Sequence, residues 1–289
     1  MRTLHISKET STSLKGLACL LIVAHHFCSW LMGKGYGNWL IDFIGVRAGV
    51  VGVTVFFFLS AYGLSESQGR NHYSFKAFIK RRLSKVYVPL IITNMIYYLF
   101  LWIINKISFN FQGFILNALN IHYLDGVLWF CNTILIFYLI FYLSFLPKSK
   151  WSKVCVCLLF TLIYSISSTI YFPDAPFYVY SIIGFPFGMV CSLYKDNIIK
   201  FNHWGYWSIL LLLILFLVAT TLPTYKKLIL MNSYCFILLI VLVALIQNVK
   251  IPKKIVLLSY IGTYSYKIYL LHNKVLVPLG QADIYCGIQ

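Results

Sequence analysis

Long runs of apolar residues are the feature that most restricts how this sequence can fold. Residues 209–219 and 236–246 contain no ionisable side chain. A helix of about 20 apolar residues spans the roughly 30 Å hydrocarbon core of a bilayer. Charged residues make up 11% of the 289 residues, whereas soluble domains contain about 25%. The chain is therefore predicted to be a multi-pass integral membrane protein.

Nine segments of the sequence are predicted to span the membrane as helices. No internal repeat and no polar second domain interrupts them, so residues 1–289 are expected to form a single transmembrane domain. The expected fold class is all-α, a polytopic transmembrane bundle of about nine to ten helices. The predicted spans are residues 14–32, 44–64, 87–105, 128–146, 154–171, 178–194, 206–222, 229–246 and 258–279.

Basic residues are distributed unevenly between the two sides of the predicted bundle. With the N-terminus in the cytoplasm, seventeen Lys and Arg fall in cytoplasmic segments and six on the opposite side, Lys274 among the six. Because positive residues are enriched in cytoplasmic loops, we expect a cytoplasmic N-terminus in the cell membrane. Attraction to anionic membrane lipids accounts for most of the net charge of +17, so no nucleic-acid partner is expected.

The eight cysteines indicate neither a metal site nor a disulfide framework. They are scattered along the chain, and Cys155 and Cys157 would lie about 200° apart on a helix. A metal ion needs ligands that converge from one face. We therefore predict buried thiols and no bound metal.

His26 is the ionisable residue with the most unusual position, deep within the first predicted span. Lys15 lies eleven residues earlier, so both side chains project from nearly the same helix face, about 16 Å apart along the axis. This spacing puts Lys15 at the cytoplasmic entrance and His26 near the bilayer midplane. A neutral imidazole there can act as the general base for acyl transfer to a hydroxyl. A histidine that hydrogen-bonds across a helix interface for packing explains the position equally well.

A basic run stands at the start of the third predicted span. It contains Lys80, Arg81, Arg82 and Lys85, followed by Tyr87. Arginine forks bind phosphate oxygens bidentately, so such a run could hold a polyanionic cofactor. An ordinary positive-inside membrane anchor explains the charges alone better.

Three further segments carry polar residues at or within predicted spans. Residues 52–63 combine small and aromatic residues with the Ser60 hydroxyl, a composition that allows close helix approach. Trp129 and Asn132 open the fourth span, and His272 ends a Ser-Tyr-Lys-Ile-Tyr-Leu-Leu-His segment in the last span. Each of these segments, taken alone, is also consistent with simple helix packing.

Taken together and in order, these segments resemble the acyltransferase 3 family of integral-membrane O-acyltransferases. The resemblance extends from about residue 14 to residue 279, nearly the whole chain. No single motif is highly specific, and it is the order of five that carries the resemblance. The matching parts are Lys15 with His26, residues 52–63, residues 80–82 with Tyr87 and Pro89, Trp129 with Phe130, and residues 265–272.

The resemblance implies an acyl-CoA donor, usually acetyl-CoA, and an acceptor hydroxyl on a sugar of a cell-surface polysaccharide or its lipid-linked precursor. It also implies that His26 is catalytic and that Arg81 and Arg82 help to bind the donor. The other candidates are Lys15, Lys80 and Tyr87 for the donor, and Ser60, Trp129, Asn132 and His272 as further site residues.

Direct transfer is the predicted mechanism, in which His26 takes the proton of the acceptor hydroxyl as it attacks the thioester carbonyl. Ser60 or Asn132 is expected to orient the imidazole or to stabilise the oxyanion. A relay through an acyl-histidine is an open alternative. The sequence assigns no carboxylate as the partner that orients His26.

The chain departs from the family pattern in several places. Lys15 stands where arginine is commoner, and Thr54 and Ala61 replace residues that are often acidic and glycine respectively. The family usually has about ten helices, so nine spans predict either a shorter member or a chain truncated near its C-terminal end. The alternative functions are a transporter or flippase for an anionic or lipid-linked solute, and an inactive family member.

Overall fold

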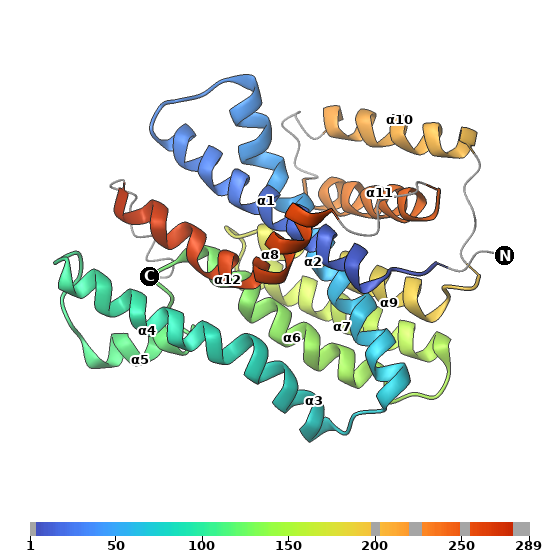
Figure 1. The fold of residues 1–289 in the computed structure, drawn as a ribbon, viewed down its shortest axis with the longest axis horizontal. Coiled ribbons are helices and arrows are strands. Elements are labelled where there is room, and N and C mark those ends of the chain that lie inside the picture. Colours follow the sequence, from blue (N-terminus) through green and yellow to red (C-terminus); the bar gives the residue numbers. More distant parts are fainter. Residues whose placement is uncertain (1–3, 198–202, 220–226, 249–254, 280–289) are drawn as a thin grey trace.

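The computed structural model describes residues 4–197, 203–219, 227–248 and 255–279, and these fold into a bundle of helices without a β-strand (Figure 1). This confirms the all-α fold class. Residues 220–222 of the seventh predicted span lie outside the described residues, as does the C-terminal end of the chain. The elements are α1 (Lys8–Gly33), α2 (Trp39–Asn71), α3 (Phe75–Arg82), η1 (Leu83–Tyr87), α4 (Val88–Ile103), α5 (Phe111–Ala118), η2 (Gly126–Leu128), α6 (Trp129–Ser144), α7 (Lys150–Tyr171), α8 (Phe177–Tyr180), α9 (Gly184–Leu193), α10 (His203–Ala219), α11 (Lys227–Asn248) and α12 (Val256–Leu279).

Six helical segments in the described part of the chain are long and apolar enough to cross a membrane, so the protein is a multi-pass membrane protein. They are α1, α2, α3 continued through α4, η2 with α6, α7, and residues Ile229–Gln247 of α11. Residues Phe177–Leu193 and Gly205–Phe216 form shorter apolar helices. Large apolar side chains on α7, such as Leu159, Leu162 and Ile170, are exposed, as expected for a helix that faces lipid.

Helices α1 and α12 lie side by side and run in the same direction. The hydroxyl groups of Ser13 and Ser259 are 3.3 Å apart, and the Cys19 thiol donates to the Ser265 carbonyl oxygen at 3.6 Å. Both pairs are separated by 246 residues, so the two helices pack in a constant register. Successive spans alternate in direction, so the first and ninth predicted spans should be parallel. The structure agrees.

The crossing of α1 and α12 depends on two glycines that face each other. A Cβ built at Gly16 would overlap the backbone carbonyl of Leu258, and one built at Gly262 would overlap that of Thr12. Small residues allow such close backbone approach between membrane helices. This contact fixes the separation of the two helices that carry Lys15 and the segment ending at His272.

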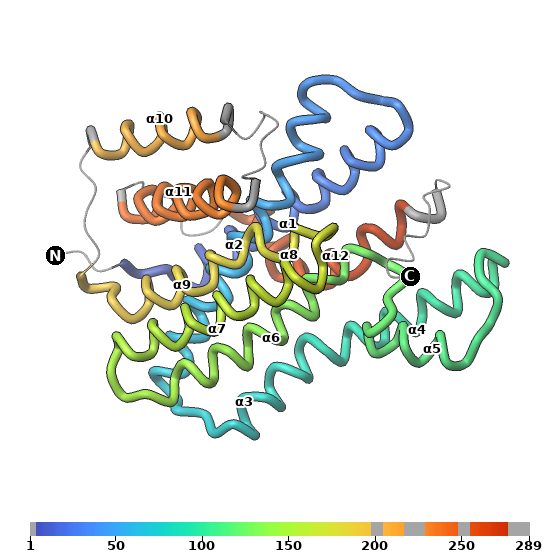
Figure 2. Tube along the Cα trace, turned by 180° about the vertical axis from the view of Figure 1, so that it is seen from behind, coloured from blue at the N-terminus to red at the C-terminus, as the bar shows by residue number. Residues whose placement is uncertain are grey.

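The core of the bundle is aromatic and centres on α2, the most buried of the six long apolar segments. Phe57 of α2 packs against Phe137 of α6 and Phe185 of α9, with ring centres 5.3 and 6.5 Å away. Figure 2 shows α9 beside α2 from the opposite side. These contacts hold α2 and α6 in place around the cavity described below.

Three details of the bundle differ from simple single spans. The third span is a continuous helix from α3 to α4 that contains a π-helical turn, η1. The sixth predicted span is interrupted at residues 181–183, which gives the short α8 followed by α9. Helix α5, which begins where the Asn110 side chain accepts from the Gly113 amide, lies in a segment for which no helix was predicted.

Candidate active site

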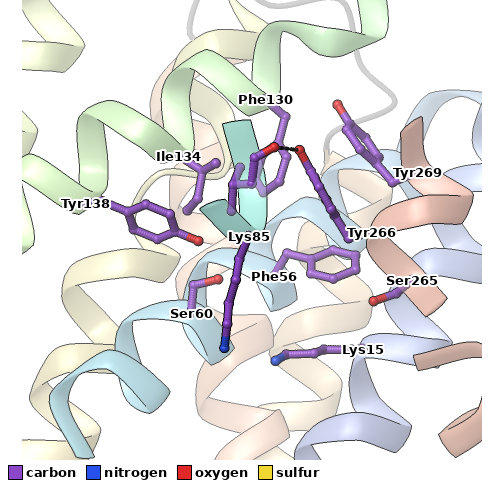
Figure 3. Close-up of a pocket in the computed structure, with 11 residues that line it drawn as sticks. Lys15, Phe56, Ser60, Lys85, Phe130, Ile134, Tyr138, Ser265, Tyr266 and Tyr269 are labelled. Atoms are coloured by element: carbon purple, nitrogen blue, oxygen red, sulfur yellow. Dashed lines mark hydrogen bonds between the residues drawn. The ribbon is translucent and has the colours of Figure 1, made fainter. Parts of the chain in front are cut away.

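A cavity of about 190 Å³ lies among α1, α2, η1, α6 and α12 (Figure 3). Its lining is apolar where α2 and α6 contribute aromatic and aliphatic side chains. The residues around it are Lys15, Phe56, Ser60, Lys85, Val86, Phe130, Ile134, Tyr138, Ser265, Tyr266 and Tyr269. The cavity therefore combines a hydrophobic body with a small number of polar groups, which is the usual composition of a ligand site.

Cations gather at one side of this cavity. The side chains of Lys15 and Lys85 extend toward each other from α1 and η1, on the side away from Tyr269 (Figure 3). The Arg82 guanidinium lies 5.7 Å from the ring centre of Tyr138, and its buried Nε has no hydrogen-bond partner among the described residues. None of the three cations has an ion-pair partner in the part of the chain that the structure describes. The cluster is suited to bind an anion.

The π-helical turn places Lys85 at the cavity and is tied to α12. The Tyr266 hydroxyl donates to the Val86 carbonyl oxygen at 2.6 Å. A π-helical turn leaves a backbone carbonyl free from the regular ladder, and such turns recur at functional sites. The turn thus supplies both a fixed contact to α12 and a cation for the cavity.

The opposite side of the cavity leads through Tyr269 to His272. The Tyr269 ring lines the cavity, and its backbone carbonyl lies 2.7 Å from Nδ1 of His272. Because a carbonyl oxygen only accepts, Nδ1 must carry the proton. Nε2 of His272 is then the unprotonated nitrogen, and it is buried with no hydrogen-bond partner among the described residues. His272 is held in the tautomer that can accept a proton at Nε2.

His26 lies beside His272, beyond the cavity wall. Their ring centres are 5.0 Å apart, and the His25 ring is 4.7 Å from His26 on the other side. His26 is half-buried and does not line the cavity itself. The constant register of α1 and α12 brings the two histidines together, since they too are 246 residues apart. Two imidazoles therefore lie beyond Tyr269, outside the cavity lining, on the side away from the cations.

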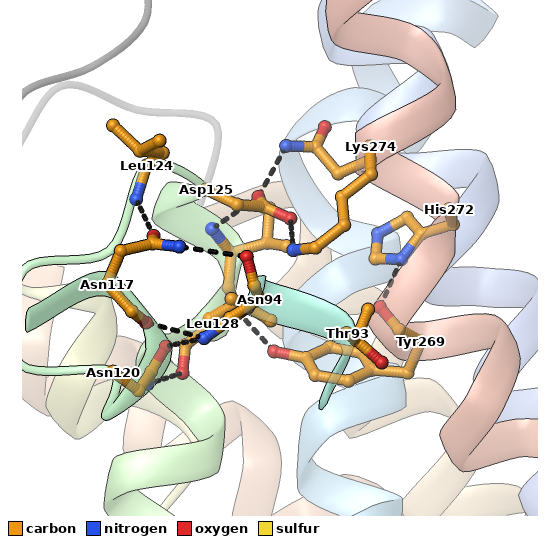
Figure 4. A network of polar contacts seen from close by, with 12 residues as sticks. Thr93, Asn94, Asn117, Asn120, Leu124, Asp125, Leu128, Tyr269, His272 and Lys274 are labelled. Atoms are coloured by element: carbon orange, nitrogen blue, oxygen red, sulfur yellow. Dashed lines mark hydrogen bonds and ion pairs between the residues drawn. The ribbon is translucent and has the colours of Figure 1, made fainter. Parts of the chain in front are cut away.

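A buried ion pair adjoins these histidines, and the sequence reasoning missed it. Nζ of Lys274 lies 2.7 Å from Oδ2 of Asp125, and only 5% and 1% of the two side chains are exposed (Figure 4). The signal that could have revealed it was a lysine within the last apolar span, because such a cation needs a partner. Lys274, near the end of the predicted span 258–279, enters the orientation argument as a residue of the non-cytoplasmic side, and Asp125 lies 149 residues away.

The sequence model of the acyltransferase 3 family, described as an acyltransferase domain, matches residues 12–285, nearly the whole chain. The chain belongs to this family. It is therefore a multi-pass membrane acyltransferase, as the ordered motifs predicted. Searches of curated proteins and of solved structures found no significant match.

Some donor-site candidates of this acyltransferase lie outside the cavity. Lys80 and Arg81 are exposed on α3, and the Arg81 guanidinium lies 4.5 Å from the ring centre of Tyr73. The Tyr87 hydroxyl donates to the Leu119 carbonyl oxygen at 3.0 Å, which ties η1 to the end of α5. Of the predicted donor residues, Lys15 lines the cavity, and Arg82 lies behind Tyr138 of its wall.

The two candidates at the start of α6 in the acyltransferase also lie away from the cavity lining. The Trp129 ring packs on Phe177 and Tyr178 of α8, with centres 5.4 and 5.3 Å away. Asn132 exchanges two hydrogen bonds of 2.9 Å with Asn120, in a network of asparagines that fixes the connection between α5 and α6. Ser60, by contrast, lines the cavity.

No three His, Cys, Asp or Glu side chains in the described part of the acyltransferase are close enough to hold a metal ion. Cys157 is buried whereas Cys155 is exposed, so the two thiols do point to different faces of α7.

Proposed function

We propose that this acyltransferase transfers an acetyl group from acetyl-CoA to a hydroxyl of a cell-surface polysaccharide or of its lipid-linked precursor. The protein would lie in the cytoplasmic membrane with its N-terminus in the cytoplasm, where acetyl-CoA is available. The observation that supports the proposal most is the sequence of three parts along α1 and α12: cations without an ion-pair partner among the described residues, an apolar cavity, and two histidines beyond the cavity wall. The phosphates of acetyl-CoA match the cations, its thioester arm matches the apolar cavity, and a hydroxyl nucleophile needs a base such as a histidine.

The residues of the cavity fit the two ends of such a donor. Drug-sized ligands occupy pockets of about 300–1,000 Å³, so a cavity of about 190 Å³ would admit the thioester end rather than the whole molecule. Lys15, Arg82 and Lys85 would then meet the phosphates at the cavity's basic side. The apolar side chains of Phe56 and Ile134 would contact the carbon chain between the two ends.

The transfer itself needs a base and a group that stabilises an oxyanion. In the proposed step the acceptor hydroxyl oxygen bonds to the thioester carbonyl carbon while His26 takes the hydroxyl proton. The carbon–sulfur bond then breaks, and the proton on His26 passes to the departing CoA thiolate. Ser60 is not placed to meet the oxyanion, because it lines the cavity beside Lys15 and Lys85, on the side away from the histidines (Figure 3); its hydroxyl would contact the donor instead. The products are the acetyl ester and CoA.

His272 supplies a second acceptor next to this base. Its Nε2 is unprotonated because Nδ1 donates to the Tyr269 carbonyl oxygen. With its ring centre 5.0 Å from that of His26, it can accept a hydrogen bond from the acceptor hydroxyl or from His26. Either contact would align the hydroxyl before attack.

The proposal is tested by acetyl transfer from radiolabelled acetyl-CoA in membranes that contain wild-type protein or the His26→Ala variant. Loss of a general base lowers kcat by about 10²- to 10⁴-fold, so label should enter polysaccharide or glycolipid with wild type alone. His122→Ala is the matched control, because this histidine is exposed on the connection after α5.

Binding of CoA to each purified variant should be measured in parallel. Binding that is unchanged in His26→Ala would show that the variant is folded and that the donor site is separate from the base. Full activity of His26→Ala would rule out the mechanism. Wild-type protein that binds no CoA and transfers no label would rule out the donor.

A further inference from the structure

The Asp125–Lys274 pair carries the only fully buried charges among the described residues. Both carboxylate oxygens are used: Oδ2 contacts Nζ of Lys274 at 2.7 Å, and Oδ1 accepts from the Asn273 side chain at 2.7 Å. The Val127 amide also donates to Oδ1, at 3.3 Å. The Tyr97 ring covers the ammonium group, with its centre 4.8 Å from Nζ. Asp125 therefore accepts from three groups, and the Lys274 ammonium is shielded from water between this carboxylate and the Tyr97 ring.

His272 is held between two attachments to the same short connection before α6. On one side of it in sequence, the Tyr269 hydroxyl donates to the Val127 carbonyl oxygen. On the other side, Asn273 and Lys274 bind Asp125. Figure 4 shows the His272 ring on α12 close to these contacts. Residues 125–127 thus fasten α12 one turn before His272 and directly after it.

Stability alone is a poor reason for such a pair. Burying two charges costs desolvation that their attraction repays only with good geometry, and well-packed apolar replacements are often as stable. The other ion pair among the described residues, Glu66–Lys195, is partly exposed, with 22% and 35% of the side chains accessible. That pair joins α2 to the end of α9, and neither residue lines the cavity.

We propose that Asp125, acting through Lys274 and Asn273, is a positioning residue that fixes His272 against His26. The inference rests on the proposed function, because it assigns the fixed histidine to acyl transfer. In this role the pair contacts neither donor nor acceptor. It sets the rotation of α12 about its own axis and its position along that axis, so that Nε2 of His272 faces the reacting groups.

The test compares single and double variants of the pair. Asp125→Asn or Lys274→Met alone leaves a buried polar or charged group without its partner and is expected to lower the yield of folded protein. Asp125→Asn with Lys274→Met removes both charges and should recover much of that yield. Per folded molecule, kcat of the double variant should fall on the order of 10- to 100-fold, with KM for acetyl-CoA within about twofold. Glu66→Gln with Lys195→Met is the matched control and should keep the wild-type kcat.

A spectroscopic readout makes the inference independent of activity. In protein with ¹⁵N-labelled histidine rings, the His272 signals are assigned by their loss in His272→Gln. They should show the Nδ1–H tautomer in both wild type and the double variant, because the Tyr269 carbonyl belongs to the same helix as His272. Adding His26→Ala should shift these signals in otherwise wild-type protein and shift them much less in the double variant, where His272 is no longer fixed against His26.

The outcomes separate this inference from the proposed function. Wild-type kcat in the double variant, or an effect of His26→Ala on the His272 signals as large in it as in wild type, would overturn the positioning role. A wild-type protein without acetyl transfer would refute the proposed function, and the response of the His272 signals to His26→Ala would still decide whether Asp125 fixes His272.

Discussion

The two sides of the cavity use positive charge in opposite ways. At the basic side, Lys15, Arg82 and Lys85 have no ion-pair partner among the described residues, and Lys85 is exposed. At the histidine side, Lys274 is buried and bound to Asp125. An unpaired cation near a cavity can bind an anionic ligand, whereas a paired and buried cation can only hold its surroundings in place. The comparison indicates that the basic side binds the anionic donor and that the histidine side holds His272 in position.

The largest expected effect on activity comes from a substitution at the crossing of α1 and α12, because it displaces the basic side and the histidine side of the site together. Gly262→Leu places a side chain into the Thr12 carbonyl at the crossing of α1 and α12. Overpacking of this kind costs about 1–3 kcal/mol or more, so we expect a lower melting temperature and loss of both CoA binding and acyl transfer. Gly63→Ala is the control, because nothing lies within 4 Å of a Cβ at that position. An unaltered melting temperature in Gly262→Leu would mean that the helices are not in close contact.

A smaller effect is expected from a change at the basic side alone. Lys85→Met removes a cation from the cavity, and a hydrogen bond to a charged group contributes about 1.5–3 kcal/mol. KM for acetyl-CoA should therefore rise about 10- to 100-fold, with little change in kcat. Lys76→Met removes an exposed charge of α3 that does not line the cavity and should leave both constants unchanged. A fall in kcat without a change in KM would contradict the division between the two sides.

The smallest effect is expected at Arg81, which the family resemblance assigns to donor binding. Its guanidinium is exposed and lies over the Tyr73 ring, and exposed charge pairs contribute about 0–1 kcal/mol. Arg81→Gln should raise KM for acetyl-CoA by at most about fivefold, with a greater difference at low salt. A larger increase would extend the basic side of the site from the cavity to the surface of α3.

The fold could be predicted from the sequence because the length of an apolar run and the position of charged residues can be read from neighbouring residues alone. Apolar runs located the long helices, and the direction of α12 followed from counting spans. Helix α5 was missed because its eight residues are too short to stand out by hydrophobicity. The π-helical turn and the interruption between α8 and α9 depend on tertiary contacts such as Tyr266 with Val86, which have no local pattern.

The candidate site could be predicted only in part, for a related reason. The spacing of Lys15 and His26 is a property of one helix, and the structure turns both toward α12. The roles predicted for the site residues stay predictions. The sequence named His272 as a candidate, but its contact with His26 and the contact of Asp125 with Lys274 could not be found in this way, because each joins elements distant in sequence. The chain has only seven Asp and Glu residues, so there are few candidate partners for a buried lysine. Even so, no sequence pattern around Asp125 indicates that it contacts α12.

The buried lysine of α12 also bears on how the protein is made. Helix α12 is not among the six segments apolar enough to cross a membrane by composition, and an unpaired lysine in the hydrocarbon region is costly. Asp125 is synthesised 149 residues earlier, so its loop must already be in place when the ribosome releases α12 for insertion. Lys274 can then be neutralised as soon as it enters the bilayer. We expect α12 to insert only against the loop that carries Asp125, so that a half-translated chain carries no assembled reaction centre.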